Sequence, residues 1–215
     1  MIKKIFVIFK VVVIVHLIVC LVNGWWAATF VCLFNLVLLF VSDFIQKKLG
    51  YNDILYLFIY IFLTGSLLGG EVYYLYVKVW YFDIIMHTLS SFIVSYLLYY
   101  IVKYFNVRIN IPLFITFIFS FAMMVASLWE ITEFIIDRVL VSDMQKDTII
   151  TEVKSKLLSS DGKSVIKKKI NSMKIDNIIV DGYVDIGLYD TMEDMICAAA
   201  GSILFIIIIK LKEAF

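Results

Sequence analysis

Three short acidic patterns lie at the ends of long apolar stretches in this sequence. Their ionisable members are six carboxylic acids and one histidine: Asp83, His87, Glu130, Glu133, Asp137, Asp190 and Asp194. An ionisable side chain at the centre of a membrane-spanning helix costs about 2.5–3.5 kcal/mol, so such residues usually mark a functional site. Carboxylate oxygens together with an imidazole are suitable ligands for Zn²⁺, Mn²⁺, Mg²⁺ or Fe²⁺. The residue types therefore indicate a site for a divalent metal ion.

The spacing within each pattern is helical. Asp83 and His87, in the first pattern, are four positions apart, and so are Asp190 and Asp194 in the third. In the middle pattern, Glu130, Glu133 and Asp137 follow at intervals of three and then four positions. Residues at these intervals lie on one face of an α-helix. If the three acidic stripes face one another, they enclose an acidic pocket. Repulsion between the carboxylates would raise some of their pKa values unless a cation lies between them, and a divalent metal ion would relieve that repulsion.

The composition identifies the class of protein that must position these stripes. Hydrophobic residues make up 63% of the chain, charged residues only 17%, and the mean hydropathy is +0.97. A soluble domain of 215 residues could not bury so much apolar surface. With a template of roughly 20 apolar residues per span, the sequence predicts an all-α polytopic membrane protein. Its bundle of six transmembrane helices is expected at residues 5–22, 27–45, 54–70, 83–105, 111–137 and 190–209.

A polar segment separates the last two of these helices. We expect residues 1–137 to hold the first five helices, 138–188 a small α+β extramembrane cap, and 189–215 the sixth helix and a short tail. Within the cap, residues 147–158 are compatible with a helix, and the lysines at 167–169 with a solvated helix face. Residues 178–180 and 183–184 flank an Asp-Gly pair, which predicts a hairpin.

The lysine and arginine distribution predicts the orientation. Outside the 138–188 segment, basic residues gather on the side shared by both termini, and the two short loops on the other side hold only Lys78. The 138–188 segment carries nine basic residues, but long segments cross the membrane with less regard to charge. The termini are therefore expected in the cytoplasm and the cap outside it. Because successive helices alternate in direction, all three acidic patterns then lie on the outer side. The richness in Ile, Lys, Phe and Tyr suggests an AT-rich bacterial genome, and we expect the protein to lie in the bacterial cytoplasmic membrane. The first helix also resembles a secretory signal, but its apolar run favours an uncleaved span.

Each acidic position has a structural alternative. Asp83 and Asp190 could be helix N-caps, which stabilise a helix without any further role. His87 could be a hydrogen-bonded packing residue, and Asp137 a solvated surface acid. Glu130 fits a structural role least well, because no basic residue lies within four positions of it.

Several separated motifs resemble the YjdF-like family of bacterial inner-membrane proteins. They are Asp83-x-x-x-His87, Trp129 to Phe134 with Asp137, Met144-Gln145, Gly187 to Asp194, and Gly201. The resemblance implies a shared fold and a shared site, but no reaction, because the family has no assigned function. This chain differs in having Ser91 where the family tends to have a smaller residue. It also has a longer connection between the glutamine and the Asp-Thr pair.

Two classes of function fit these patterns best. The first is a metal-dependent membrane hydrolase or transferase acting on a lipid or lipid-linked substrate. Its candidate metal ligands are Asp83, His87, Glu130, Asp137 and Asp194, and its candidate general bases are Glu133 and Asp190. The second is a small cation- or proton-coupled transporter or channel; a non-catalytic sensing subunit is a further alternative. The lipid bilayer is the expected partner, nucleic acid is not, and the sequence does not indicate an oligomeric state.

Overall fold

The computed structural model describes residues 2–213 and contains six helices that are long and apolar enough to cross a membrane. These are α1 (Ile2–Val22), α2 (Trp26–Leu49), α3 (Asp53–Thr64) with its continuation η1 (Gly65–Val72), α5 (Phe82–Tyr104), α6 (Ile111–Val139) and α7 (Leu188–Glu213). A short helix, α4 (Leu75–Lys78), precedes α5. The predicted membrane fold, with six spans and an insertion before the last, is confirmed. The chain divides into two compact units, Met1–Ser127 with Asp194–Phe215, and Leu128–Glu193.

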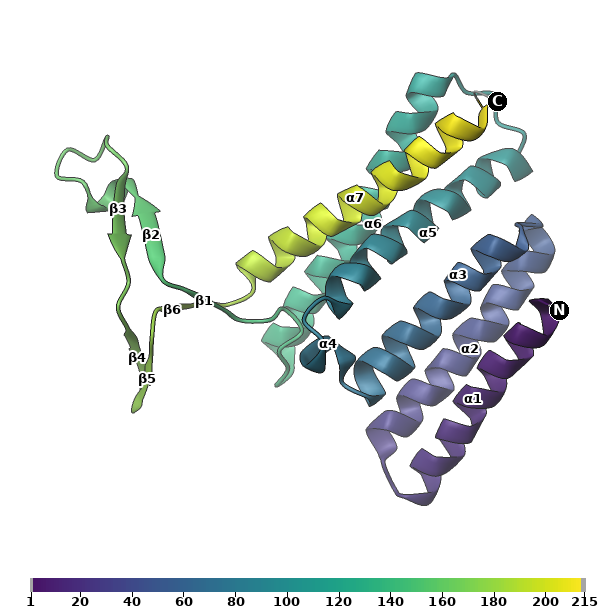
Figure 1. The fold of residues 1–215 in the computed structure, drawn as a ribbon, viewed down its shortest axis with the longest axis horizontal. Helices are drawn as coiled ribbons and strands as arrows, with labels where there is room; N and C mark the ends of the chain where they lie inside the picture. Colours follow the sequence, from purple (N-terminus) through teal and green to yellow (C-terminus); the bar gives the residue numbers. More distant parts are fainter. Residues whose placement is uncertain (1, 214–215) are drawn as a thin grey trace. The chain divides into compact units, whose positions relative to one another are not determined.

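Within the first unit, α1, α2 and α3 pack against one another around a core that includes the fully buried Val13, Leu39 and Tyr60. The α3 helix also contacts α5, and these helices lie side by side in Figure 1. Side chains that face outward from this bundle are mostly large and apolar, as a lipid environment requires.

The α5 and α7 helices approach each other closely. The Ser95 hydroxyl donates a hydrogen bond of 2.9 Å to the Ser202 hydroxyl, and both residues are fully buried. At Gly201, a Cβ atom would lie only 2.0 Å from the backbone carbonyl oxygen of Thr88. Small residues allow membrane helices to pack at short distance, so Gly201 is required for this helix pair.

The third span differs from its predicted end at the glycine pair. Instead of stopping there, the helix continues as the π-helix η1 through Val72. Gly70 faces the ring of Tyr76, where a Cβ atom would lie 2.1 Å from a ring carbon. This glycine therefore provides room for packing and does not end the helix.

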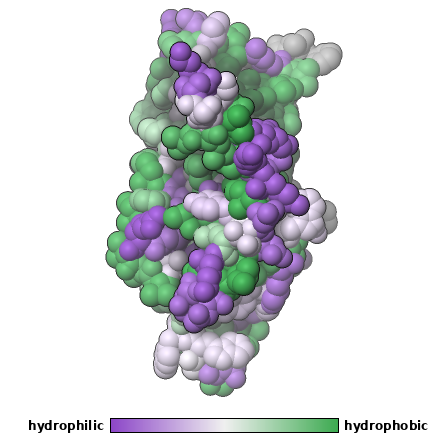
Figure 2. Space-filling model, turned by 90° about the vertical axis from the view of Figure 1, so that its left-hand side faces the viewer, coloured by the Kyte–Doolittle hydropathy of each residue, from purple (hydrophilic) through white to green (hydrophobic). Residues whose placement is uncertain are grey.

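The cap consists of three separate antiparallel strand pairs. They are β1 (Thr148–Ile150) with β6 (Tyr183–Asp185), β2 (Glu152–Ser155) with β3 (Ile166–Lys169), and β4 (Met173–Ile175) with β5 (Ile178–Val180). No hydrophobic side chain between residues 140 and 187 is buried, so the cap has no hydrophobic core of its own. Figure 2 faces the hairpins and shows hydrophilic groups lying beside hydrophobic ones on the surface.

Two sequence expectations for the cap were wrong. Residues 147–158 form β1, β2 and a single 3-10 turn (η2, Lys156–Leu158), and the lysines at 167–169 lie on β3. The β-branched residues at 148–151 and Val153, and Ile166 at the start of β3, favour extended structure over a helix once a partner strand is available. The partner strands, β6 for β1 and β3 for β2, lie farther along the chain. A pattern read within one short segment could not reveal these pairings.

The two strands beside Asp181-Gly182 were placed correctly but do not pair with each other. β5 pairs with β4 through a turn in which Asp176 adopts a left-handed φ of 52°, and β6 pairs with β1. Gly182 has a φ of 122°, and a Cβ atom there would lie 2.8 Å from the Ile150 carbonyl oxygen. This glycine therefore bends the chain from one strand pair into the next.

Candidate functional site

Two carboxylates and one imidazole meet between α5 and α7 in the first unit. The His87 Nε2 atom lies 3.3 Å from Asp83 Oδ1 and 3.4 Å from Asp194 Oδ2. Asp83 and His87 are one helical turn apart on α5, and their side chains are 13% and 12% exposed. The Asp194 side chain is only 3% exposed. We call these three residues the acid–histidine group.

The spacing of this group suits a metal ion. One potential ligand atom from each residue lies within 4.8 Å of the other two. A tetrahedral ion with bonds of about 2.0–2.1 Å separates its ligand atoms by roughly 3.3–3.4 Å, whereas right-angle octahedral neighbours lie about 2.9 Å apart. The two nitrogen–oxygen distances of the group match the tetrahedral value. The arrangement could therefore hold a metal ion with little movement of these atoms.

The close approach at Gly201 explains why the group forms. Asp194 and Gly201 are seven positions apart on α7, which places them on the same face two turns apart. Thr88, whose carbonyl oxygen faces Gly201, directly follows His87 on α5. The contact that lets the two helices touch therefore also directs Asp194 toward α5.

In the second unit, Glu130 and Glu133 are buried on α6, with exposed fractions of 5% and 7%. A carboxylate oxygen of one lies within 4.8 Å of a carboxylate oxygen of the other. Glu130 also borders a cavity of about 320 Å³. The other residues lining this cavity are Ile131, Phe134, Gln145, Ile186, Gly187, Leu188 and Thr191.

The remaining two predicted site residues bind backbone groups at the start of the cap. Asp137 accepts hydrogen bonds from the N–H groups of Met144 and Gln145, at 2.8 Å from each donor nitrogen. Asp190 accepts one from the N–H of Lys146 at 3.1 Å. Among the residues that the structure describes, neither aspartate belongs to a group of three possible metal ligands. Both contacts hold the chain that leaves α6.

Gln145, Gly187 and Thr191 belong to the same junction, although spacing alone gave them no role. The Gln145 amide donates a hydrogen bond of 2.5 Å to the Thr191 hydroxyl. Gly187 has a φ of 91°, and a Cβ atom there would lie 2.6 Å from the Cβ of Gln145. The presence of all three residues in the motifs of the family resemblance was the only signal that could have connected them.

A second charged cluster in the first unit was missed by sequence reasoning. Asp43 on α2 accepts hydrogen bonds from Lys10 on α1 and from the hydroxyls of Tyr56 and Tyr60 on α3. We call these four residues the Asp43 network. Asp43 is the lone acid of its predicted span, and this was a signal that could have been followed.

The electrostatic environment of the cap junction is acidic. Burial raises the pKa of the Asp143 carboxyl, and the nearby carboxylates of Asp147 and Asp137 raise it further. Farther along the cap, Glu152 on β2 forms an exposed ion pair with Lys167 on β3, with a separation of 2.6 Å. Exposed pairs of this kind contribute little to stability.

Comparison of the chain with curated proteins and with solved structures gives no match. The model of one family, described as a predicted membrane protein family with the designation DUF2238, matches residues 2–213. The match includes all six spans, the cap and every residue of the sites described above, and it is consistent with the YjdF-like resemblance. The chain therefore belongs to the DUF2238 family of predicted membrane proteins.

Proposed function

We propose that this protein binds a divalent metal ion at Asp83, His87 and Asp194 and uses it for hydrolysis or group transfer on a lipid or lipid-linked substrate. The observation that carries the proposal is the convergence of two aspartate oxygens on one imidazole nitrogen, at 3.3 and 3.4 Å. A metal ion bound there would lower the pKa of a coordinated water molecule and polarise a phosphoryl or carbonyl oxygen. Two carboxylates and one imidazole suit Zn²⁺, Mn²⁺, Mg²⁺ or Fe²⁺.

The sequence pattern suggests further roles for the acids of α6. From helical spacing, Glu130 is a proposed further ligand, and Glu133, one turn along the same helix, is the proposed general base that would take a proton from the attacking water. Asp190 is the weaker candidate for the base, because one of its oxygens accepts the Lys146 N–H. Asp137 is omitted from the proposed ligands, because both of its oxygens accept backbone hydrogen bonds.

The cavity beside Glu130 supports an amphiphilic substrate. Its volume of about 320 Å³ is at the lower end of the range for small-molecule sites. Phe134 and Leu188 supply apolar walls, whereas Gln145 and Thr191 supply polar groups. This combination suits a polar headgroup attached to an apolar chain.

Metal analysis of the purified protein tests the first part of the proposal. After incubation with Zn²⁺, Mn²⁺, Mg²⁺ or Fe²⁺ and removal of excess, the wild type should retain about one ion per chain. The variants His87→Ala and Asp194→Asn should retain much less. Asp53→Asn is a matched control, because Asp53 lies in the first turn of α3 and outside the group. Absence of bound metal from the wild type under all four conditions would refute the metal site.

Activity measurements test the second part. The wild type and Glu133→Gln would be compared on a panel of short-chain lipid phosphates and lipid esters in detergent micelles. Removal of a general base typically lowers the rate by about 10²–10⁴-fold, so Glu133→Gln should keep its metal and lose turnover. A metal-loaded wild type that turns over no member of the panel would count against these substrates, and equal rates for both proteins would exclude Glu133 as the base.

The Asp43 network favours one second candidate, a cation or proton carrier. A carrier needs polar groups along the bundle in addition to those at one end, and Lys10, Asp43, Tyr56 and Tyr60 provide such a cluster within three spans. Proteoliposomes containing a pH-sensitive dye would report proton movement. Dye response that is abolished in Asp43→Asn would support a carrier, whereas metal-dependent turnover without ion movement would support the enzyme.

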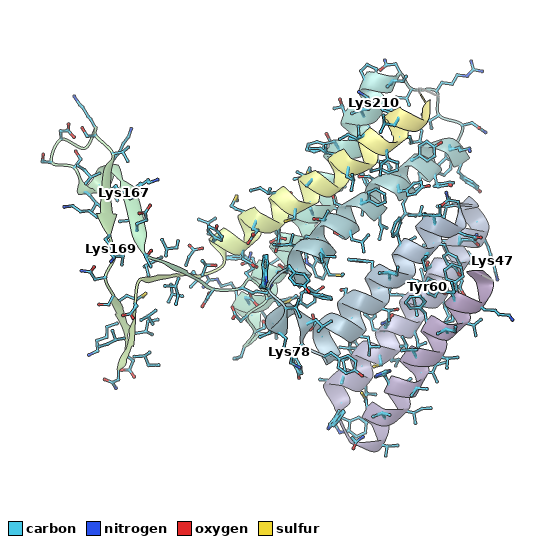
Figure 3. The ribbon with its side chains drawn as sticks, in the orientation of Figure 1. Lys47, Tyr60, Lys78, Lys167, Lys169 and Lys210 are labelled. Atoms are coloured by element: carbon cyan, nitrogen blue, oxygen red, sulfur yellow. The ribbon has the colours of Figure 1, made fainter. Side chains whose placement is uncertain are left out.

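The proposed orientation has both termini in the cytoplasm and the cap outside. Lys47 and Lys210 lie at the ends of α2 and α7, at one end of the first unit, and Lys78 lies at the other end (Figure 3). Reporter fusions at the C-terminus and within the cap would test this orientation. Cytoplasmic reporter activity from a fusion at the exposed Ser160 would reverse it.

A further inference from the structure

A second cavity, of about 530 Å³, lies where α5 ends and α6 begins. Its polar lining includes Lys103 in the last turn of α5, together with Asn106 and Arg108 in the connection. Val102 and Phe114 are among its apolar walls. Neither the acid–histidine group nor the Asp43 network contributes to this cavity, so its chemistry is separate from the proposed function.

The cavity is positively charged without local compensation. Among the residues that the structure describes, no aspartate or glutamate lines it, and the sequence contains none between Asp83 and Glu130. Within the part of the chain that the structure describes, neither Lys103 nor Arg108 forms an ion pair with a carboxylate. Two uncompensated cations in one concave site attract an anion.

The helix ends around the cavity do not cancel this charge. The last carbonyl groups of α5 accept hydrogen bonds from the N–H groups of Phe105, Asn106 and Val107, which satisfies much of the negative end of that helix. At the start of α6, Asn110 accepts a hydrogen bond of 2.9 Å from the Leu113 N–H through its side chain, and another from the Phe114 N–H through its carbonyl oxygen. Both helix ends are therefore largely satisfied, and the positive charge of the cavity comes from its two basic side chains.

The position of the cavity at the end of α5 indicates where such an anion would come from. α5 has 23 residues, which corresponds to a length of about 34 Å, slightly more than the hydrocarbon core of a bilayer. Lys103, in its last turn, is therefore expected at the depth of the lipid headgroups. The positive-inside rule accounts for basic residues in a connection, but not for an acid-free cavity with apolar walls at that depth.

We propose that this cavity binds the phosphate group of an anionic phospholipid. Lys103 and Arg108 contact the phosphate oxygens, Arg108 with the planar donor geometry that suits phosphate, and Val102 and Phe114 contact the start of the acyl chains. Free inorganic phosphate shares the recognised chemistry. Headgroup depth and the apolar walls favour the lipid as the source.

Native mass spectrometry tests this proposal on the whole protein. Wild type would be titrated with phosphatidylglycerol, phosphatidylcholine and inorganic phosphate in detergent. The double variant Lys103→Gln/Arg108→Gln should bind phosphatidylglycerol about 25-fold more weakly, because each basic residue contributes roughly a fivefold preference. The control Lys47→Gln/Lys48→Gln removes the same charge at the end of α2 and should bind as the wild type does (Figure 3).

Each outcome has a defined meaning. Equal binding of phosphatidylglycerol and phosphatidylcholine by the wild type, or unchanged binding by the double variant, would overturn the proposal. Saturable binding of inorganic phosphate that displaces the lipid would assign the site to phosphate from solution. Should the double variant fail to fold, photoactivatable phosphatidylglycerol on the wild type gives an independent answer: labelling within residues 99–114 supports the site, and labelling elsewhere contradicts it.

Discussion

The acid–histidine group and the Asp43 network are both charged clusters within membrane-spanning helices, yet they differ in how their charges are balanced. The network surrounds one carboxylate with one ammonium group and two hydroxyl donors. The acid–histidine group places two carboxylates around one imidazole. The first pairs its acid with a permanent cation, whereas the second sets two acids against a base that is charged only when protonated.

This difference shows that a carboxylate within the membrane is not, by itself, a sign of chemistry. A carboxylate with its own cation and hydroxyl donors can serve to join helices, as Asp43 joins α1, α2 and α3. Two carboxylates that converge on one nitrogen need a proton or a metal ion to offset their repulsion.

Metal affinity should separate the two clusters most clearly. Asp194→Asn removes a proposed ligand and should weaken binding more than about 100-fold, beyond the loss typical of residues that only support a ligand. Asp43→Asn should leave affinity within about twofold of the wild type, because it is not part of the acid–histidine group. Isothermal titration calorimetry in detergent would measure both. Equal losses in the two variants would mean that the clusters are not functionally distinct.

Stability should also distinguish the two clusters, but here the larger effect is expected from the Asp43 network. Asp43→Ala leaves the Lys10 ammonium without its partner, which costs about 3–5 kcal/mol for a fully buried pair and less here, because a fifth of each side chain is exposed. Reversible unfolding in mixed detergent micelles would measure the change. The double variant Lys10→Met/Asp43→Leu should recover most of the loss. Failure of the apolar pair to recover stability would indicate that the ion pair has a role beyond joining helices.

Gly201→Ala should affect the acid–histidine group through the backbone. The added methyl group would overlap the Thr88 carbonyl oxygen and force α5 and α7 apart. Overpacking of this kind costs about 1–3 kcal/mol, and metal affinity should fall about 10-fold as Asp194 moves away from His87. Gly50→Ala is a useful contrast, because Gly50 has open space around it but a φ of 65°. It should lower stability through backbone strain and leave metal affinity unchanged.

Tyr60→Phe should have a smaller effect. It removes one of three donors to Asp43 and leaves the ion pair with Lys10 in place, so the expected loss of stability is about 1 kcal/mol. The same unfolding measurement would detect it. A loss as large as that of Asp43→Ala would show that the hydroxyl, and not the ammonium, is the principal partner of Asp43.

The smallest effect is expected in the cap, where Asp143 has acidic neighbours and a raised pKa. A folded-state pKa above the ordinary value means that folding favours the protonated carboxyl, so the cap should lose stability as pH rises through that interval. Asp143→Asn removes this dependence and should slow proteolysis of the cap at neutral pH. Unaltered cleavage rates at both acidic and neutral pH would contradict this assignment.

Much of the candidate site could be anticipated, because helical spacing and alternating direction are properties of the sequence. The four-residue interval between Asp83 and His87 did place them on one face, and the second turn of the last span did carry Asp194. Helical spacing could not show that Asp137 differs from the candidate ligands. Its hydrogen bonds reach Met144 and Gln145 across an irregular connection whose path no periodicity encodes.

The sequence by itself determined the membrane class, the six spans and the helical faces that carry the acids, because the bilayer requires long apolar helices and their pitch is constant. Only the tertiary structure decided which faces meet. The contact of Gly201 with Thr88 directs Asp194 to His87, whereas Asp43 faces Lys10 and two tyrosines. Strand pairing in the cap was likewise decided in three dimensions, because a strand's partner is set by contacts between segments distant in the chain.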